Sequence, residues 1–228
     1  MKYKYLLFDL DGTLFDYDKA ESTALENTFL QFGFSYNSKY LDTYREINHL
    51  IWQDFENGKI AQKELKTKRF NQLGKSLSLN LDSSTFSDIY LINLSKGIDL
   101  IDSADELLEK LINKAKLYLI TNGLTIVQRP RIKNSTIGKY FNNVIISEEI
   151  GFAKPQKEIF DLTFELMGNP NKDEVLIIGD SLSSDISGGI NYGIDTCWYN
   201  PKRNKSDNNI IPTYEIQELK ELLKIILN

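Results

Sequence analysis

Residues 4–14 read KYLLFDLDGTL, a short apolar run that ends in an Asp-Gly turn at Asp11 and Gly12. The run is continuously apolar rather than alternating, which is typical of a strand buried on both faces of a parallel sheet. Two similar runs lie far downstream: residues 116–120 read KLYLI, and residues 174–178 read EVLII. The three runs together indicate the central strands of a parallel sheet.

Helical patterns separate the strands in the second part of the chain. Residues 143–146 and 195–199 are weaker strand candidates, and apolar residues at helical spacing lie between the strands. One of these helices is expected to start with a capping box from Ser103 to Glu106. Strands that alternate with helices from Ile101 onward predict an α/β fold with a doubly wound, Rossmann-like parallel sheet.

The segment from residue 16 to residue 97 contains no good strand candidate. Its apolar residues recur at helical spacing in three rows that begin near Ala20, Tyr40 and Phe70, with breaks at Gly33 and Gly58. Its length of about 80 residues is usual for a small domain. We therefore predict an α/β core domain made of residues 1–15 and 98–228, with a helical cap domain inserted at residues 16–97.

The composition disfavours several other classes of protein. The chain has 228 residues, 27 of them basic and 32 acidic, so its formal net charge is −5. A binder of nucleic-acid polymers usually needs a basic face, which this balance does not favour.

Cys197 is the single cysteine, which excludes an intrachain disulfide and a cysteine-rich zinc site. No apolar run approaches the roughly 18 residues of a membrane span, and Asp9 stands where a signal peptide would still be apolar. We expect a soluble, cytoplasmic protein.

The residues that follow the apolar runs are the candidates for chemistry, because ligands of parallel sheets bind beyond the carboxyl ends of the strands. Three groups meet this condition: Asp9, Asp11 and Thr13 after the first run, Thr121, Asn122 and Gly123 after the second, and Gly179, Asp180, Ser181 and Asp185 after the third. Several carboxylates at one edge repel each other unless a cation neutralises them. Mg²⁺ fits best, since it commonly binds one or two carboxylates together with water and substrate phosphate.

A phosphate site is expected beside this cation. Thr121 offers a hydroxyl, and Asn122 and Gly123 offer amides near the start of a helix. Lys154 follows a strand candidate and adds a positive charge. Asp9 is then placed to act as a carboxylate nucleophile that forms an aspartyl-phosphate. Asp11, two residues on, is expected to face the same side as Asp9, to protonate the leaving oxygen and later to deprotonate the attacking water.

These motifs resemble those of the haloacid dehalogenase superfamily of phosphatases. All four motifs of the superfamily are found in order: DLDGTL at residues 9–14, TNG at residues 121–123, Lys154 with Pro155, and GDSLSSD at residues 179–185. The helical insert resembles the superfamily's cap. The resemblance implies that Asp9 is the nucleophile and a metal ligand, and that Asp11 is the acid–base group and binds the metal through its backbone carbonyl.

The remaining site residues also take roles from the resemblance. Thr121 and Asn122 would hold phosphate, Lys154 would stabilise the nucleophile and the phosphate, and Asp180 would bind magnesium. Asp185 would hold metal-bound waters or Lys154. Pro130 departs from the pattern, since it falls in the helix expected after Thr121 and should kink or shorten that helix.

A narrower resemblance is to the pyrimidine 5′-nucleotidase subgroup. It is carried by TNG at residues 121–123, ISEEIGFAKP at residues 146–155, SDISGGINYG at residues 184–193 and TCW at residues 196–198. It implies a phosphatase of nucleoside monophosphates such as dUMP, UMP and dTMP. We expect a monomer or a homodimer, and the sequence does not decide between them. The alternative within enzymes is a phosphatase of another small phosphate ester, such as phosphoglycolate or a sugar phosphate. A catalytically inactive binding module is the rival from another class.

The helical insert offers few side chains to assign. His49, the only histidine, is expected to be structural or exposed. The aromatic residues Phe15, Tyr17, Tyr44 and Trp52 are expected mostly in a core, although one or two of these rings could stack on a pyrimidine.

Overall fold

The computed structural model describes residues 1–206 and 209–227. Its centre is a six-stranded sheet in the order β3-β2-β1-β4-β5-β6, and every neighbouring pair of strands is parallel. The strands are β1 Tyr5–Phe8, β2 Lys116–Thr121, β3 Asn143–Ile146, β4 Val175–Gly179, β5 Asp195–Tyr199 and β6 Tyr214–Ile216. The doubly wound, Rossmann-like sheet predicted from the sequence is confirmed, including the two weaker strands. Only β6 was not predicted.

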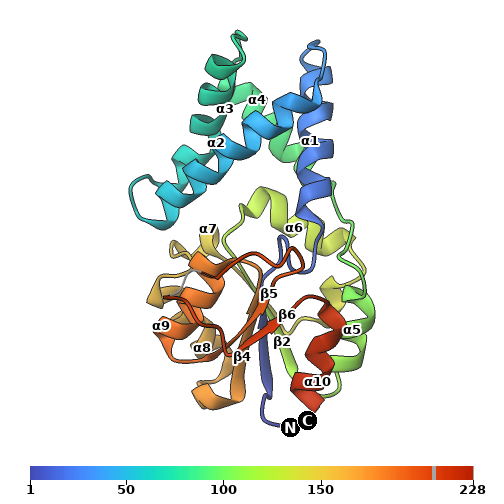
Figure 1. Ribbon diagram of the computed structural model, residues 1–228, viewed down its shortest axis with the longest axis vertical. Coiled ribbons are helices and arrows are strands. Elements are labelled where there is room, and N and C mark those ends of the chain that lie inside the picture. Colours follow the sequence, from blue (N-terminus) through green and yellow to red (C-terminus); the bar gives the residue numbers. More distant parts are fainter. Residues whose placement is uncertain (207–208, 228) are drawn as a thin grey trace.

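Helices cover both faces of the sheet (Figure 1). They are α5 Ala104–Leu111, α6 Thr125–Asn134, α7 Ser147–Ile150, α8 Lys157–Met167, α9 Ser187–Tyr192 and α10 Leu222–Leu227, with a π-helical turn at Leu182–Ile186 before α9. Leu6 and Phe8 of β1 pack in the cluster that contains α5 and α10, whereas Leu7 packs in the cluster of α8 and α9. Burial on both faces is the physical reason for the continuously apolar strand sequence.

The sequence analysis made two local predictions for the helices beside the sheet, a capping box at Ser103 and an effect of Pro130 on the helix after Thr121. Ser103 precedes α5 with φ of 67° and its side chain caps no amide, so the predicted capping box is wrong. A left-handed backbone at the cap position differs from the extended geometry in which a serine side chain reaches the first-turn amides. Pro130 lies inside α6, and the helix continues past it to Asn134. Proline therefore does not end α6.

The inserted segment forms four helices: α1 Tyr17–Gln31, α2 Ser38–Glu56, α3 Gln62–Ser76 and α4 Ser83–Leu94. They lie beyond one end of the sheet (Figure 1) and share an apolar cluster of their own, to which Leu124 and Val127 of α6 contribute. The helical insert is confirmed, with α4 as an additional helix that the sequence patterns missed. The domain boundaries at residues 15/16 and 97/98 stay a prediction.

The two segments that join the insert to the sheet region run side by side. The Asp16 amide donates to the Asp99 carbonyl at 2.9 Å, and the Ile101 amide donates to the Leu14 carbonyl at 2.9 Å. Phe15 forms isolated bridges with Asp11 and with Leu100. We call residues 11–16 and 97–101 together the neck. Across residues 1–206 and 209–227, the helices are too short or too polar to span a membrane.

Candidate active site

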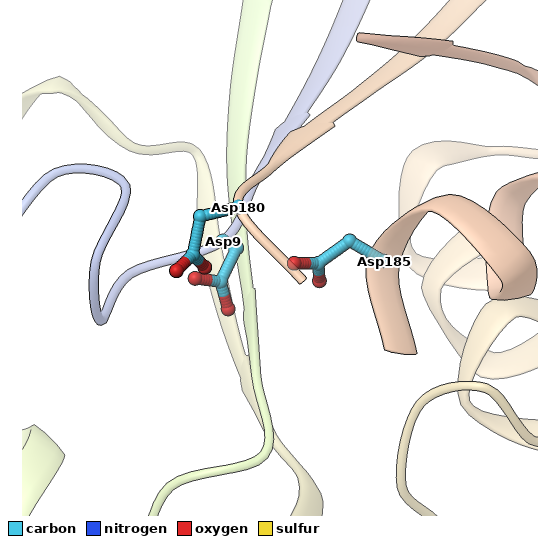
Figure 2. Close-up of side chains that lie close together, drawn as sticks. All are labelled: Asp9, Asp180 and Asp185. Carbon is cyan, nitrogen blue, oxygen red and sulfur yellow. The ribbon is translucent and has the colours of Figure 1, made fainter. Parts of the chain in front are cut away.

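Three acidic side chains meet at the carboxyl edge of the sheet (Figure 2). Asp9 directly follows β1, Asp180 directly follows β4, and Asp185 lies on the π-helical turn. One carboxylate oxygen from each lies within 4.8 Å of the other two. The strand order reverses around β1 and β4, which is where open α/β sheets bind ligands. The sequence prediction that these carboxylates converge is therefore confirmed by their positions.

Lys154 bonds to two of the three acids, Asp9 and Asp185. Its Nζ atom donates to Asp9 Oδ1 at 2.7 Å, to Asp185 Oδ1 at 2.6 Å and to the Ile120 carbonyl at 2.7 Å. The side chain is only 1% exposed. Burial lowers the pKa of Lys154, but the two carboxylates outweigh it and raise the pKa above its ordinary value. Lys154 is thus a fixed positive charge in the floor of the site.

The electrostatics of the acids fit a divalent cation. Burial is the main cause that raises the pKa of Asp9 to about 7, against the attraction of Lys154. The pKa of Asp180 is raised well above its ordinary value, first by desolvation and then by repulsion from Asp9 and Asp185. Three carboxylates face one ammonium, which leaves an excess of negative charge. Hard oxygen donors with uncompensated charge are the ligands that Mg²⁺ binds.

The loop after β2 lies beside these acids. Thr121 is buried, and its Oγ1 accepts a hydrogen bond from the Gly123 amide at 3.1 Å. The Asn122 side chain donates to the Lys154 carbonyl and accepts from the Lys154 amide, both at 2.8 Å. The Asn122 amide therefore fixes the loop that carries Lys154. This contact between the second and third motifs was not foreseen from the sequence.

Asp11 has partners that the sequence did not reveal. Its Oδ2 accepts from Gln128 Nε2 at 2.5 Å, and its Oδ1 accepts from Arg131 Nη1. Asp11 lines the same pocket as Asp9, but α6 holds its carboxylate. The sequence did contain a feature that could have indicated these partners: Gln128 and Arg131 are polar and lie three residues apart on the helix that follows the Thr121 loop.

A pocket of about 350 Å³ lies above the acids. Its floor includes Asp9, Thr121, Lys154 and Asp180. The wall opposite this floor is formed by α1 and α2 of the insert. The insert contributes eight side chains, namely Tyr17, Asp18, Glu21, Arg45, Asn48, His49, Trp52 and Glu56. His49 was expected to be structural or exposed, and the aromatic residues mostly in a core with one or two free to stack on a base; the structure places His49, Tyr17 and Trp52 in the wall of the pocket.

Polar side chains of the pocket wall form a connected network. Glu21 is almost fully buried and accepts from Arg45 Nε at 2.9 Å and from Asn48 Nδ2 at 3.3 Å. Asn48 Oδ1 accepts in turn from the buried Arg69 at 3.0 Å. Burial raises the pKa of Glu21, and the hydrogen bond from Arg45 opposes this. Buried polar networks with paired partners hold fixed side-chain directions, as a binding wall requires.

Comparison with known proteins identifies the family. The family model described as haloacid dehalogenase-like hydrolase matches residues 6–199. The chain belongs to the haloacid dehalogenase-like hydrolases. This confirms the resemblance drawn from the four motifs, and it makes the protein an enzyme.

Full-length relatives of this haloacid dehalogenase-like hydrolase include two nucleotidases. Pyrimidine 5′-nucleotidase YjjG of Escherichia coli is 34% identical over 226 residues, which cover 99% of both chains. Pyrimidine 5′-nucleotidase PynA of Streptococcus pneumoniae is 38% identical over 224 residues, covering 98% of this chain and 94% of that one. Both names are those of phosphoric monoester hydrolases.

A solved structure matches the whole hydrolase. HAD-hydrolase YfnB of Bacillus subtilis is 38% identical, and its crystal structure superimposes with a TM-score of 0.95, covering 99% of both chains. That structure is bound to magnesium and reveals interdomain movement. The haloacid dehalogenase-like fold thus extends to the helical insert as well as to the sheet.

Proposed function

We propose that this hydrolase is a Mg²⁺-dependent phosphomonoesterase that converts pyrimidine nucleoside 5′-monophosphates, such as dUMP, UMP and dTMP, to nucleoside and phosphate. The observation that carries the proposal is the cluster of Asp9, Asp180, Asp185 and Lys154 in the floor of a pocket walled by polar and aromatic side chains. The two relatives named pyrimidine 5′-nucleotidase support the choice of substrate.

Asp9 is the nucleophile in this proposal. A carboxylate oxygen of Asp9 forms a bond to phosphorus while the bond from phosphorus to the ester oxygen breaks, which gives an aspartyl-phosphate. Asp11 gives its proton to the departing oxygen, so that the nucleoside leaves as a neutral alcohol. Water then attacks the phosphorus while Asp11 takes up a proton from the water. The bond between phosphorus and the Asp9 oxygen breaks, which releases phosphate and regenerates the free Asp9 carboxylate.

Fixed charges and dipoles surround the phosphoryl group. Lys154 already bonds to Asp9 and would neutralise part of the charge that the phosphoryl oxygens bring. Thr121 and the amides of Asn122 and Gly123 would receive the phosphate, while the Asn122 side chain keeps Lys154 in place. Asp185 holds Lys154 from the other side.

A magnesium ion would be held by Asp9, Asp180 and the backbone carbonyl of Asp11. When bound, it supplies positive charge that offsets the repulsion between the nucleophile and the phosphate. The raised pKa values of Asp9 and Asp180 support such a site, because burial and the neighbouring acids both disfavour the charged carboxylates, and a bound cation would stabilise them.

The helical insert would supply the contacts to the nucleoside. Trp52, Tyr17 and His49 offer flat faces for a base, and Asn48 offers an amide whose direction Glu21 and Arg69 fix. We propose that residues 16–97 act as a cap that closes over the substrate and excludes water. The substrate is a metabolite of the cytoplasm, which is where we propose that the enzyme works.

A panel of phosphate esters tests the function. Phosphate release is measured with Mg²⁺ for dUMP, UMP, dTMP, AMP, phosphoglycolate and a hexose phosphate. We expect the highest kcat/KM on the pyrimidine nucleotides, and loss of activity on addition of EDTA. A clear preference for phosphoglycolate or the sugar phosphate would replace the nucleotide assignment. The absence of activity on every ester would contradict the hydrolytic proposal.

A further inference from the structure

Arg131 is a fully buried cation that the proposed chemistry does not use directly. It lies on α6 with no exposed surface, and its Nη1 forms an ion pair with Asp11. Its Nε donates to the Gly97 carbonyl at 2.7 Å, and its guanidinium lies 4.5 Å from the centre of the Phe15 ring. One side chain therefore contacts the acid–base residue and both segments of the neck.

Gln128, one turn earlier on α6, completes the arrangement. Its Nε2 donates to the second carboxylate oxygen of Asp11 at 2.5 Å, and its Oε1 accepts from Arg131 at 3.2 Å. Both oxygens of Asp11 are thus held by neighbouring side chains of one helix, with the two holding groups bonded to each other. Gln128 is also fully buried.

Burial of a guanidinium is costly, and stability alone does not explain it. An ion pair buried in a protein often contributes no more to stability than apolar residues of the same volume. The ion pair does fix the orientation of the Asp11 carboxylate, because the planar guanidinium binds a carboxylate in a fixed geometry. Proton transfer in catalysis depends on such positioning of the acid.

We propose that Arg131 and Gln128 are positioning residues that hold the Asp11 carboxylate for proton transfer and tie its place to the neck. This rests on the proposed function of Asp11 as acid and base. Neither residue gains or loses a proton: the proton passes from Asp11 to the ester oxygen as the phosphoryl group moves to Asp9. Because Arg131 bonds to Gly97, a displacement of the neck moves the group that orients Asp11.

The choice of leaving group separates positioning from general damage. An alkyl ester such as dUMP needs a proton on its departing oxygen, whereas p-nitrophenolate leaves readily without one. The first turnover is measured by rapid mixing with Mg²⁺ for both esters, because hydrolysis of the aspartyl-phosphate comes later.

The variants are Arg131→Met, Arg131→Lys and Gln128→Met, which keep much of the side-chain volume. Arg129→Met is the matched control, since Arg129 is on the same helix but is exposed in an ion pair with Glu149.

We expect Arg131→Met to slow the first turnover of dUMP by about 100-fold, the lower range for loss of acid–base catalysis. The first turnover of p-nitrophenyl phosphate should fall less than about tenfold, and KM and inhibition by inorganic phosphate should stay near wild type. Arg131→Lys should recover part of the dUMP rate, and Gln128→Met should show the same selectivity with a smaller loss. Arg129→Met should match wild type on both esters.

Two outcomes would overturn the proposal: equal losses on both esters, or wild-type rates in the variants that fold. Should Arg131→Met not fold, Arg131→Lys and Gln128→Met decide the question alone. Should the wild type cleave β-glycerophosphate but not dUMP, the nucleotide assignment fails. The same comparison is then made with β-glycerophosphate as the alkyl ester, so that the two proposals are judged separately.

Discussion

Asp9 is subject to conflicting demands. As the proposed nucleophile it must be a carboxylate, but it is 7% exposed and lies beside two further acids. Burial raises its pKa from the ordinary value of 3.8 to about 7, although Lys154 acts in the other direction. The native state without metal therefore disfavours the charged form of Asp9. Function and stability oppose each other at this residue.

Asp9→Asn tests this conflict as well as the proposed chemistry. A carboxyl whose pKa is raised on folding stabilises the native state below its unfolded pKa, and this contribution is lost as pH rises from about 4 to about 7. In EDTA, the stability of the wild type relative to Asp9→Asn should therefore decline between pH 5 and pH 8. With Mg²⁺ the variant should lose turnover by roughly 10³-fold or more.

The measurements are urea unfolding at several pH values and phosphate release. Asp161→Asn is the control, since Asp161 pairs with Lys157 on an exposed helix face, and it should match wild type in turnover. Wild-type turnover in Asp9→Asn would falsify the nucleophile assignment. A relative stability that rises with pH would contradict the raised pKa.

The residues of the site differ in how far the sequence reveals them. Asp9 and Asp180 directly follow buried strands, so the parallel sheet dictates that they meet. The partners of Asp11 were not predictable in this way, because they depend on which face α6 turns toward the first motif. The polar wall of Glu21 and Asn48 was missed since it depends on packing between α1 and α2.

At the level of elements, strands buried on both faces gave the clearest signals. β1, β2 and β4 are continuous apolar runs, and β1 pairs in parallel with both β2 and β4. β6, at the sheet edge, has three residues and only one of them buried, so its sequence carries little pattern. Helix α4 was missed although Asp82 accepts a hydrogen bond from the Ser84 amide at its start and Phe86 and Tyr90 face inward. For β6 the reason is its length, since three residues are too few to establish a period; the 12 residues of α4 were long enough, but the sequence analysis did not recognise them.

Phe86 shows how the inserted helices are held together. It is fully buried on α4, with ring centres of Phe29, Phe32 and Phe70 at 5.1, 5.0 and 5.2 Å. Phe86→Ala should lower the free energy of unfolding by about 3–5 kcal/mol, because it removes apolar contacts and leaves a cavity. Urea unfolding measures the change.

Ile92→Ala on the same helix is the matched control, since Ile92 is 49% exposed. Its free energy of unfolding should change by less than about 0.5 kcal/mol. Equal effects of the two substitutions would show that the aromatic cluster is not what stabilises the insert.

For the molecule as a whole, the excess of acid in the site predicts that stability depends on a cation. A ligand that binds only the native state stabilises it, by about 2.7 kcal/mol when its concentration is 100 times Kd. Mg²⁺ should therefore raise the thermal midpoint of the wild type. Asp180→Asn should lose most of this increase, because it removes one of the ligands, and scanning calorimetry with and without Mg²⁺ measures it.

Asp173→Asn is the control for the magnesium experiment, since Asp173 is an exposed acid in the segment before β4. It should keep the full increase in midpoint. If Asp180→Asn responds to Mg²⁺ as the wild type does, the cation does not bind at the cluster of Asp9, Asp180 and Asp185.

The neck also has a consequence for how such enzymes diversify. The chain leaves the sheet near Asp16 and returns near Asp99, and a hydrogen bond of 2.9 Å joins these residues. Another helical segment could therefore be inserted at two adjacent crossover points, provided that Gly97 keeps its bond to Arg131 and that the new helices cover Leu124 and Val127 of α6. New substrates could be acquired by grafting, while the proposed catalytic residues Asp9 and Asp11 before the insert and Lys154 and Asp180 after it remain unchanged.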